Sequence, residues 1–207
     1  MPEHISFAIF HPKPLLVVIS GPSGVGKDSA LISLKARQLP LHFVVTATTR
    51  KIRPGEVDGV DYFFYDRAKF EDMIAKNELL EWAVVYQDYK GIPKEQIRQA
   101  MNSGKDVIMR VDVQGAATIR RLCPEAVLIF LTPANEEEWL ERLKARKTET
   151  PDSLAVRTAT ARDELTHVHE FDYVVVNSEG RLEQAVDTIV RIIDAEHHKV
   201  QHRTITL

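Results

Sequence analysis

Short apolar runs alternate along this chain with segments whose apolar residues recur at helical spacing. The apolar runs are rich in β-branched residues and each predicts a buried strand, at residues 15–20, 43–46, 106–111, 127–131 and 173–176. Helical spacing predicts helices over residues 27–35, 135–146 and 181–197. Strands that alternate with helices form a parallel sheet covered on both faces, so the pattern predicts an α/β fold.

Two segments depart from this alternation. Residues 46–95 are rich in turns and polar residues, with aromatic strand-like pieces at 62–65 and 79–86, and they predict an inserted α+β lobe. Residues 144–162 are dense in Lys, Arg, Thr and Asp, and we expect them to be exposed and mobile. We expect the 207 residues to form a single domain that includes both segments.

Composition narrows the possible partners and compartment. The formal net charge of −3 gives no strong electrostatic reason to bind nucleic acid or an anionic membrane. No apolar stretch reaches the roughly 18 residues of a membrane span, and the start has no signal-peptide pattern. The single cysteine, Cys123, excludes a disulfide within the chain, so we expect a reducing compartment, the cytoplasm, and a buried thiol.

A glycine-rich loop lies between the first predicted strand and the first predicted helix. It consists of Gly21, Pro22, Ser23, Gly24, Val25, Gly26 and Lys27. Glycines allow backbone N–H groups to surround phosphate oxygens, the helix N-terminus adds partial positive charge, and the lysine reaches the β- and γ-phosphates. The motif predicts an ATP-binding loop; the alternative is a turn with a surface lysine.

The residue after the loop lysine departs from the usual motif. A Ser or Thr hydroxyl normally stands there to meet Mg²⁺, but this chain has Asp28, followed by Ser29. A carboxylate is a hard oxygen ligand that holds Mg²⁺ directly or through water, and an unpaired one repels phosphate. Both interpretations of Asp28 stay open.

Several motifs in order resemble guanylate kinases. They lie at residues 48–62, which contain Thr-Thr-Arg-Lys-Ile-Arg-Pro-Gly-Glu, and at 80–83, 111–116, 142–150 and 172–177. The resemblance covers residues 15–195 and does not extend to the flanks. It implies a P-loop NTPase three-layer fold with a parallel sheet. Residues 14–45, 96–141 and 167–198 would form the core, 46–95 the GMP-binding lobe and 142–166 a helical lid.

The resemblance also implies an activity. It is the ATP-dependent phosphorylation of GMP, and also of dGMP, by in-line phosphoryl transfer, in purine nucleotide metabolism and recycling. ATP and Mg²⁺ would be the cofactors, and the protein would act as a monomer or homodimer without nucleic acid or membrane partners.

The resemblance assigns substrate-binding roles in the lobe. Arg50, Arg53 and Tyr62 would hold the GMP phosphate, which suits guanidinium forks and a phenol hydroxyl. Glu56 belongs to the same motif, and Lys90 is a further phosphate ligand.

Glu81 would recognise the guanine base, because its carboxylate accepts from the adjacent N1–H and N2 amino donors. A site built for these hydrogen bonds rejects AMP by roughly 10⁴-fold. Thr46 would lie near the base, and Asp112 near both the base and the metal, so Asp28, Ser29 and Asp112 are the candidate Mg²⁺ ligands.

Three positions differ from the commoner pattern of the family. Lys90 and Ile92 stand where Tyr and a hydroxyl residue are usual, and Arg110 replaces an acidic residue two positions before Asp112. With Asp28, this combination is similar to the plastid-type branch. It leaves the details of base recognition and metal binding open.

Arg142, Arg146 and Arg157 match the lid arginines of the family. Such arginines stabilise charge on the transferring group, and with Lys27 and Arg50 they form the predicted catalytic set. Asn177 would contact the adenine side.

Two other interpretations remain. The scaffold could phosphorylate another small acceptor, or it could be a protein-binding module, a class expected to lose Lys27 or the lid arginines. The eight histidines are interpreted as solvated, and the Met and Trp positions as core.

Overall fold

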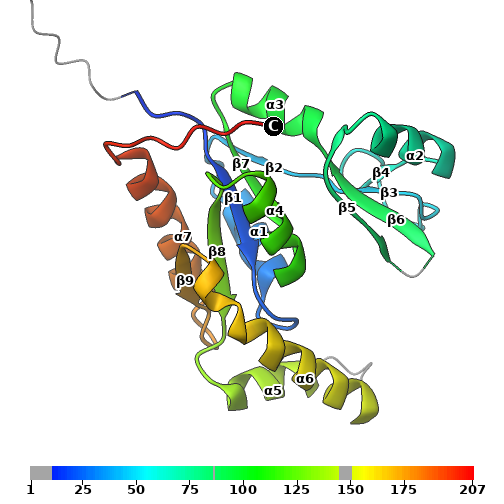
Figure 1. Ribbon diagram of the computed structural model, residues 1–207. Helices are drawn as coiled ribbons and strands as arrows, with labels where there is room; N and C mark the ends of the chain where they lie inside the picture. Colours follow the sequence, from blue (N-terminus) through cyan, green and yellow to red (C-terminus); the bar gives the residue numbers. More distant parts are fainter. Residues whose placement is uncertain (1–10, 86, 145–150) are drawn as a thin grey trace, which may run out of the picture.

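The computed structural model describes residues 11–85, 87–144 and 151–207. Its central sheet is parallel throughout and has the strand order β2-β7-β1-β8-β9 (Figure 1). The strands are β1 (Leu16–Ser20), β2 (Leu41–Phe43), β7 (Asp106–Arg110), β8 (Val127–Thr132) and β9 (Tyr173–Val176). The predicted mostly parallel α/β fold is confirmed.

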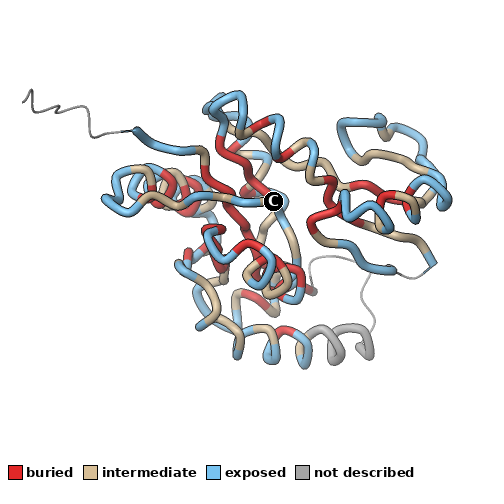
Figure 2. The backbone as a smooth tube through the Cα atoms, turned by 45° about the horizontal axis from the view of Figure 1, so that its top comes forward, coloured by how far each residue is buried: buried red, intermediate tan, exposed pale blue. Residues whose placement is uncertain are grey.

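Residues of β1 alternate between two hydrophobic clusters. Val17 and Ile19 pack with helices α1 (Lys27–Ala36) and α7 (Leu182–His197) on one face of the sheet. Leu16 and Val18 pack with α3 (Lys94–Asn102) and α4 (Val113–Leu122) on the other. Since both faces are covered, the uninterrupted apolar run is the pattern expected of a central parallel strand. The buried stretches of Figure 2 follow these strands through the middle of the molecule.

The expected strand at residues 43–46 is wrong in its position. Strand β2 ends at Phe43, and the chain then leaves the central sheet for a second one. The backbone of Val45 is bonded by a side chain: its N–H donates to Gln96 Oε1 at 2.8 Å, and its carbonyl accepts from Gln96 Nε2 at 2.7 Å. The apolar run therefore marks a crossing between sheets.

The second sheet has the order β4-β3-β6-β5 and lies beside the central one, at the right of Figure 1. It comprises β3 (Ala47–Thr48), β4 (Phe63–Phe64), β5 (Leu79–Val85) and β6 (Asp88–Pro93), with helix α2 (Arg67–Ala75). Its buried core is small and consists of Ala47, Phe70, Met73 and Leu79. Trp82, expected in a core, is 46% exposed because it lies on the open face of β5.

The segment of residues 144–162, expected to be exposed and mobile, is largely exposed at residues 158–162, where side-chain burial is described, except for Ala161; its mobility stays a prediction. Helix α6 (Pro151–Thr166) follows α5 (Glu136–Lys144), and Ala161 is buried in the cluster that contains Trp139. A small side chain at this position allows the polar helix to approach the core closely. Residues 145–150 lie outside the described part of the chain.

The C-terminal flank is fixed by a buried carboxylate. Glu196, near the end of α7, accepts hydrogen bonds from Arg203 at 2.7 Å, from Lys199 at 2.6 Å and from Tyr173. Burial alone would raise the pKa of Glu196, but these donors outweigh it and lower the pKa to about 2. Among the described residues, no helix has the length and apolarity needed to cross a membrane.

Candidate active site

The glycine-rich loop lies between β1 and the N-terminus of α1. Gly21 and Gly26 both have positive φ, at 135° and 93°. A Cβ on Gly21 would lie 2.1 Å from the carbonyl oxygen of Leu131, and one on Gly26 would lie 2.5 Å from Asn177 Nδ2. Only glycine therefore satisfies the turn and the close approach together. The first backbone N–H groups of a helix have no acceptor within the helix, so the start of α1 offers the donors that an anion site uses.

Lys27 lies inside the loop. Its ammonium donates to the carbonyl oxygens of Gly21 and Pro22, the latter at 2.9 Å. Burial lowers the pKa of Lys27, and the carboxylate of Glu164 opposes that shift most strongly. A desolvated cation interacts strongly with an entering phosphate.

Asn177 and Arg142 hold the loop from behind. The side-chain amide of Asn177 donates to the carbonyl of Val25 at 2.8 Å, and Arg142 donates to the carbonyl of Asn177 at 2.8 Å. Arg142 also pairs with Glu138 and with Glu179. In this structure both residues position the loop; the predicted contacts of Asn177 with adenine and of Arg142 with the transferring phosphate stay predictions.

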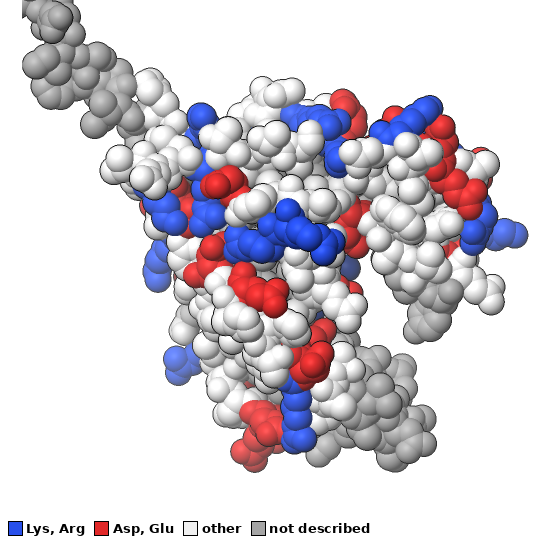
Figure 3. Space-filling model, in the orientation of Figure 1, with Lys and Arg blue, Asp and Glu red and all other residues white. Residues whose placement is uncertain are grey.

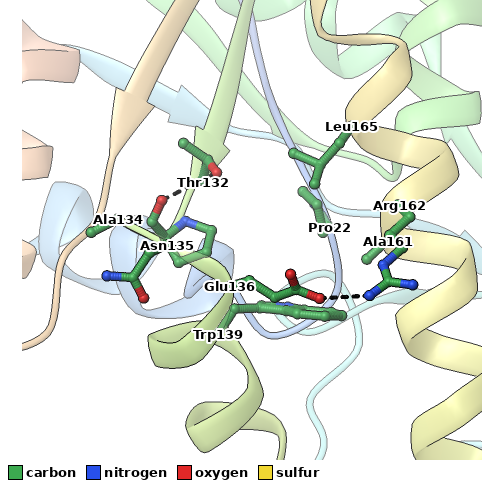
Figure 4. A pocket seen from close by; sticks show the side chains of 10 residues that line it. Pro22, Thr132, Ala134, Asn135, Glu136, Trp139, Ala161, Arg162 and Leu165 are labelled. Carbon is green, nitrogen blue, oxygen red and sulfur yellow. Dashed lines mark hydrogen bonds and ion pairs between the residues drawn. The ribbon is translucent and has the colours of Figure 1, made fainter.

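An apolar cavity of about 210 Å³ opens next to the loop, between the end of β8, α5 and α6. In Figure 4 the ring of Trp139 forms one wall, Leu165 and Ala161 of α6 stand opposite, and Glu136 pairs with Arg162 across the opening at 2.9 Å. The indole nitrogen of Trp139 donates to the carbonyl of Ser23 at 2.8 Å, which ties the cavity wall to the loop. The shape and polarity suit a flat heterocycle attached to loop-bound phosphates.

A second cavity, of about 360 Å³, joins the loop to the small sheet. It corresponds to the hollow between the right-hand lobe and the body in Figure 3. Most of the residues predicted to bind the acceptor line it, namely Thr46, Tyr62, Glu81, Lys90 and Asp112, together with Lys27. We call it the acceptor pocket. Segments far apart in sequence thus bring two ammonium groups and two carboxylates into one space.

The two carboxylates of the acceptor pocket have different surroundings. Burial raises the pKa of Glu81, and the nearby carboxylate of Asp112 raises it further. Asp112 is the N-cap of α4, and its Oδ1 accepts from the backbone N–H of Gly115 at 2.7 Å. Glu81 therefore sits in an environment that favours a ligand donating hydrogen bonds to it.

Arg50 is held at the edge of the acceptor pocket. Its guanidinium forms a bidentate pair with Glu56, at 2.8 and 2.7 Å, and lies 5.1 Å from the centre of the Tyr62 ring. Hydrogen bonds from Arg50 and from the backbone of Arg53 lower the pKa of Glu56 to about 2. Glu56 thus orients Arg50, and its predicted place among the substrate-binding residues stays a prediction.

The departures from the usual motif have distinct surroundings. Ile92 is only 3% exposed and packs in the hydrophobic cluster beneath α3 and α4, and it also lines the acceptor pocket. Lys90 Nζ lies 5.8 Å from the centre of the Tyr62 ring and lines the same pocket. Arg110 forms an ion pair with Asp28. Ile92 therefore supplies apolar surface, Lys90 and Arg110 add cations, and Asp28 adds a carboxylate that pairs with Arg110.

Not all predicted residues meet at the acceptor pocket. Ser29 is exposed and lines a groove between α1 and α7, because successive helical residues point about 100° apart and only Asp28 faces Arg110. Ser29 and Asp112 therefore line different recesses, and the role of Ser29 as a Mg²⁺ ligand stays a prediction. Arg146 lies outside the described residues, as does the side chain of Arg157 in α6.

Glu164 is a site residue that the sequence analysis missed. It lies in the last turns of α6, half-buried, and it interacts electrostatically with Lys27 and Asp112. Burial raises the pKa of Glu164, while the charge of Lys27 lowers it. No local signal distinguishes this glutamate from others on a charged helix; only its neighbours across the fold identify it.

Comparison with known proteins gives a consistent result. The chain matches the family described as Guanylate kinase over residues 13–196. It is 55% identical over 197 residues to "Guanylate kinase 2, chloroplastic/mitochondrial" of Oryza sativa subsp. japonica, covering 95% of this chain and 69% of that protein. It is 46% identical to "Guanylate kinase" of Halalkalibacterium halodurans, covering 90% and 91% of the two chains.

A solved structure is similar as well. The crystal structure of guanylate kinase from Anaplasma phagocytophilum matches with a TM-score of 0.69 at 28% sequence identity, covering 93% of this chain and 90% of that one. The similarity spans the central sheet, the lobe and the helices between them.

Proposed function

The chain belongs to the guanylate kinase family and phosphorylates GMP to GDP with ATP, and we propose that three parts of the structure divide this reaction. The core of residues 14–45, 96–141 and 167–198 binds ATP, residues 46–95 bind GMP, and residues 142–166 form the lid. The observation that carries the proposal is the acceptor pocket, where the loop's Lys27 and the buried Glu81 line one cavity.

On the donor side, the adenine enters the apolar cavity beside Trp139, and the phosphates lie in the loop with residues 21–29. Lys27 leaves the carbonyls of Gly21 and Pro22 and binds the phosphate oxygens. The hydrogen bonds of Lys27 become stronger in this exchange, because a phosphate anion is a stronger acceptor for an ammonium group than a neutral carbonyl.

On the acceptor side, Glu81 accepts hydrogen bonds from the guanine N1–H and amino group, with Thr46 beside it. Arg50, Arg53, Tyr62 and Lys90 bind the GMP phosphate. Phosphoryl transfer then needs in-line placement of the acceptor oxygen and stabilisation of charge on the moving group. Because no covalent intermediate on the protein is needed, positioned cations carry the catalysis, with Arg142, Arg146 and Arg157 of the lid completing the set.

The carboxylates around the loop fit a Mg²⁺ ion. Mg²⁺ is commonly bound through one or two carboxylates together with substrate phosphates and waters. Asp28 and Asp112 supply such a donor set, since both lie close enough to Lys27 to raise its pKa. The ion would neutralise charge on the β- and γ-phosphates.

Three finer features belong to the same proposal. The acceptor pocket also binds dGMP, because none of the residues assigned to the base or the phosphate is assigned a contact with the ribose 2′-hydroxyl. The protein acts as a monomer or homodimer. Its compartment is the cytoplasm, although the rice relative carries the name chloroplastic/mitochondrial.

The test is a turnover assay with ATP, Mg²⁺ and each of GMP, dGMP, AMP, CMP and UMP, in which ADP formation is followed. We expect turnover with GMP and dGMP, and a preference for GMP over AMP of about 10⁴-fold in kcat/KM. Turnover with a different acceptor would replace GMP as the substrate. No turnover with any nucleotide would contradict the enzyme and favour a protein-binding module.

A further inference from the structure

Two residues that depart from the usual family motif contact each other. Asp28 lies in the first turn of α1, directly after Lys27, and Arg110 is the last residue of β7. Arg110 Nη1 donates to Asp28 Oδ1 across 82 positions of sequence. The ion pair therefore connects the ATP-binding loop to the strand that leads into the acceptor pocket.

Arg110 lies between two recesses. It lines the acceptor pocket together with Lys90 and Tyr62, and it lines a neighbouring recess together with Asp28 and Asp61. Because Arg110 borders both recesses, it is placed to serve either of them. In the acceptor pocket it would join Lys90 and the Tyr62 hydroxyl around the place assigned to the GMP phosphate.

The ion pair between Arg110 and Asp28 is weak and can be replaced once Asp28 has another cation. The side chains of Arg110 and Asp28 are 39% and 67% exposed, and ion pairs this exposed contribute little to stability. A guanidinium binds a phosphate dianion by two charge-assisted hydrogen bonds, which is a stronger interaction. A phosphate in the acceptor pocket is therefore a competent partner for Arg110 once Asp28 has another cation.

Asp28 keeps Arg110 in the ion pair until another cation binds the Asp28 carboxylate. A bare carboxylate next to the phosphates of ATP is unfavourable, and the ion pair with Arg110 neutralises Asp28. The cation that accompanies ATP has the chemistry to replace Arg110, because hard divalent ions prefer carboxylate oxygens. Binding of ATP with its cation and release of Arg110 are thus linked.

We propose that Arg110 is a phosphate-binding residue for GMP, held in reserve by Asp28 and released when ATP and its cation occupy the loop. This inference rests on the proposed function. It makes the binding of the two substrates cooperative, and the coupling passes through one pair of side chains. By linkage, GMP then tightens ATP binding by the same factor.

The test is calorimetric titration of GMP into the folded protein, with and without Mg²⁺ and an ATP analogue that has a nitrogen bridge between its β- and γ-phosphates. For the wild type we expect the analogue to tighten GMP binding by about tenfold, within the usual range of coupling between sites. Arg110→Gln should bind GMP like the wild type without the analogue and should lose the tightening.

Asp28→Asn separates this inference from a merely structural role. It releases Arg110 permanently, so GMP should bind about tenfold more tightly even without the analogue, and the analogue should add little. The double variant should behave like Arg110→Gln. Arg110→Lys keeps a charge and should retain part of the coupling.

A matched control exists on the same helix. Arg37, at the other end of α1, pairs with Glu183 and Asp187 at 2.8 and 2.7 Å, far from the loop. Arg37→Gln should keep the wild-type coupling. The inference would be overturned if Asp28→Asn bound GMP with the wild-type affinity in both states, or if Arg110→Gln kept the full tightening by the analogue. Neither result would contradict the turnover of GMP. Failure of the wild type to bind GMP in both states would overturn the proposed function as well.

Discussion

The two sheets of this protein differ most in the size of the core behind them. The central sheet is buried on both faces by two extensive hydrophobic clusters, whereas the small sheet rests on Ala47, Phe70, Met73 and Leu79 (Figure 2). Local stability follows the amount of buried apolar contact. The ATP-binding loop is therefore built on the rigid part, and the acceptor residues are carried by the part that opens more easily.

The lobe compensates for its small core with polar contacts to the backbone. Backbone N–H groups of Phe64 and Val57 donate to the carboxylates of Asp58 and Asp61, at 2.9 and 2.8 Å. Such bonds fix loop geometry but add little stability in water. This arrangement fits the proposed role of the lobe, which would have to close on GMP and open to release GDP.

Core substitutions test this difference most strongly. Phe70→Ala in the lobe should cost roughly 3–5 kcal/mol, and Ile129→Ala in β8 roughly 2–5 kcal/mol, because both side chains are fully buried. Hydrogen exchange should show the first loss confined to residues of the lobe and the second spread over the central sheet. Equal acceleration of exchange in both sheets for either variant would show that they unfold as one unit.

Removing the loop lysine should separate catalysis from stability. Lys27→Ala should lower kcat by about 10²–10³-fold, the range found when one preorganised donor to transition-state charge is lost. The melting temperature should stay close to the wild-type value, because among the described residues the ammonium bonds two carbonyl groups of its own loop. A large drop in melting temperature would mean that Lys27 holds the loop together.

Glu81→Gln should weaken the acceptor side alone. We expect kcat/KM for GMP to fall by roughly 10–100-fold, the value of a hydrogen bond to a charged group, with KM for ATP unchanged. Because burial raises the pKa of Glu81, the wild-type kcat/KM should fall on acidification at a higher pH than an ordinary glutamate would cause. Glu81→Gln should not show this fall in kcat/KM at low pH. If the fall persists in the variant, it belongs to another titrating group.

The smallest effect concerns the lobe's own ion pair. Glu56→Gln should raise KM for GMP a few-fold and leave kcat nearly unchanged, because Arg50 loses its bidentate partner but keeps the Tyr62 ring. As pH falls toward about 2, the folded pKa of Glu56, the wild type should come to resemble the variant. A fall in kcat with unchanged KM would instead place Glu56 in the transfer step.

The sequence by itself determined the parts that depend on local spacing. The loop of residues 21–27, the strand before it and the helix after it follow from glycine positions and apolar periodicity, and the structure has them there. The same reasoning failed at residues 43–46, where an apolar run crosses between sheets. Hydrophobicity alone does not record which partner an apolar residue packs against.

Tertiary structure alone decided which side chains meet. Asp28 and Arg110 each looked like an isolated departure until the fold brought them together, and Glu164 looked like any glutamate on a polar helix. Arg142, predicted to act in the lid, forms an ion pair with Glu138 and donates a hydrogen bond to the carbonyl of Asn177. Local periodicity reports on neighbours within a few residues, whereas these contacts depend on how strands and helices stack, so no single stretch of sequence contains them.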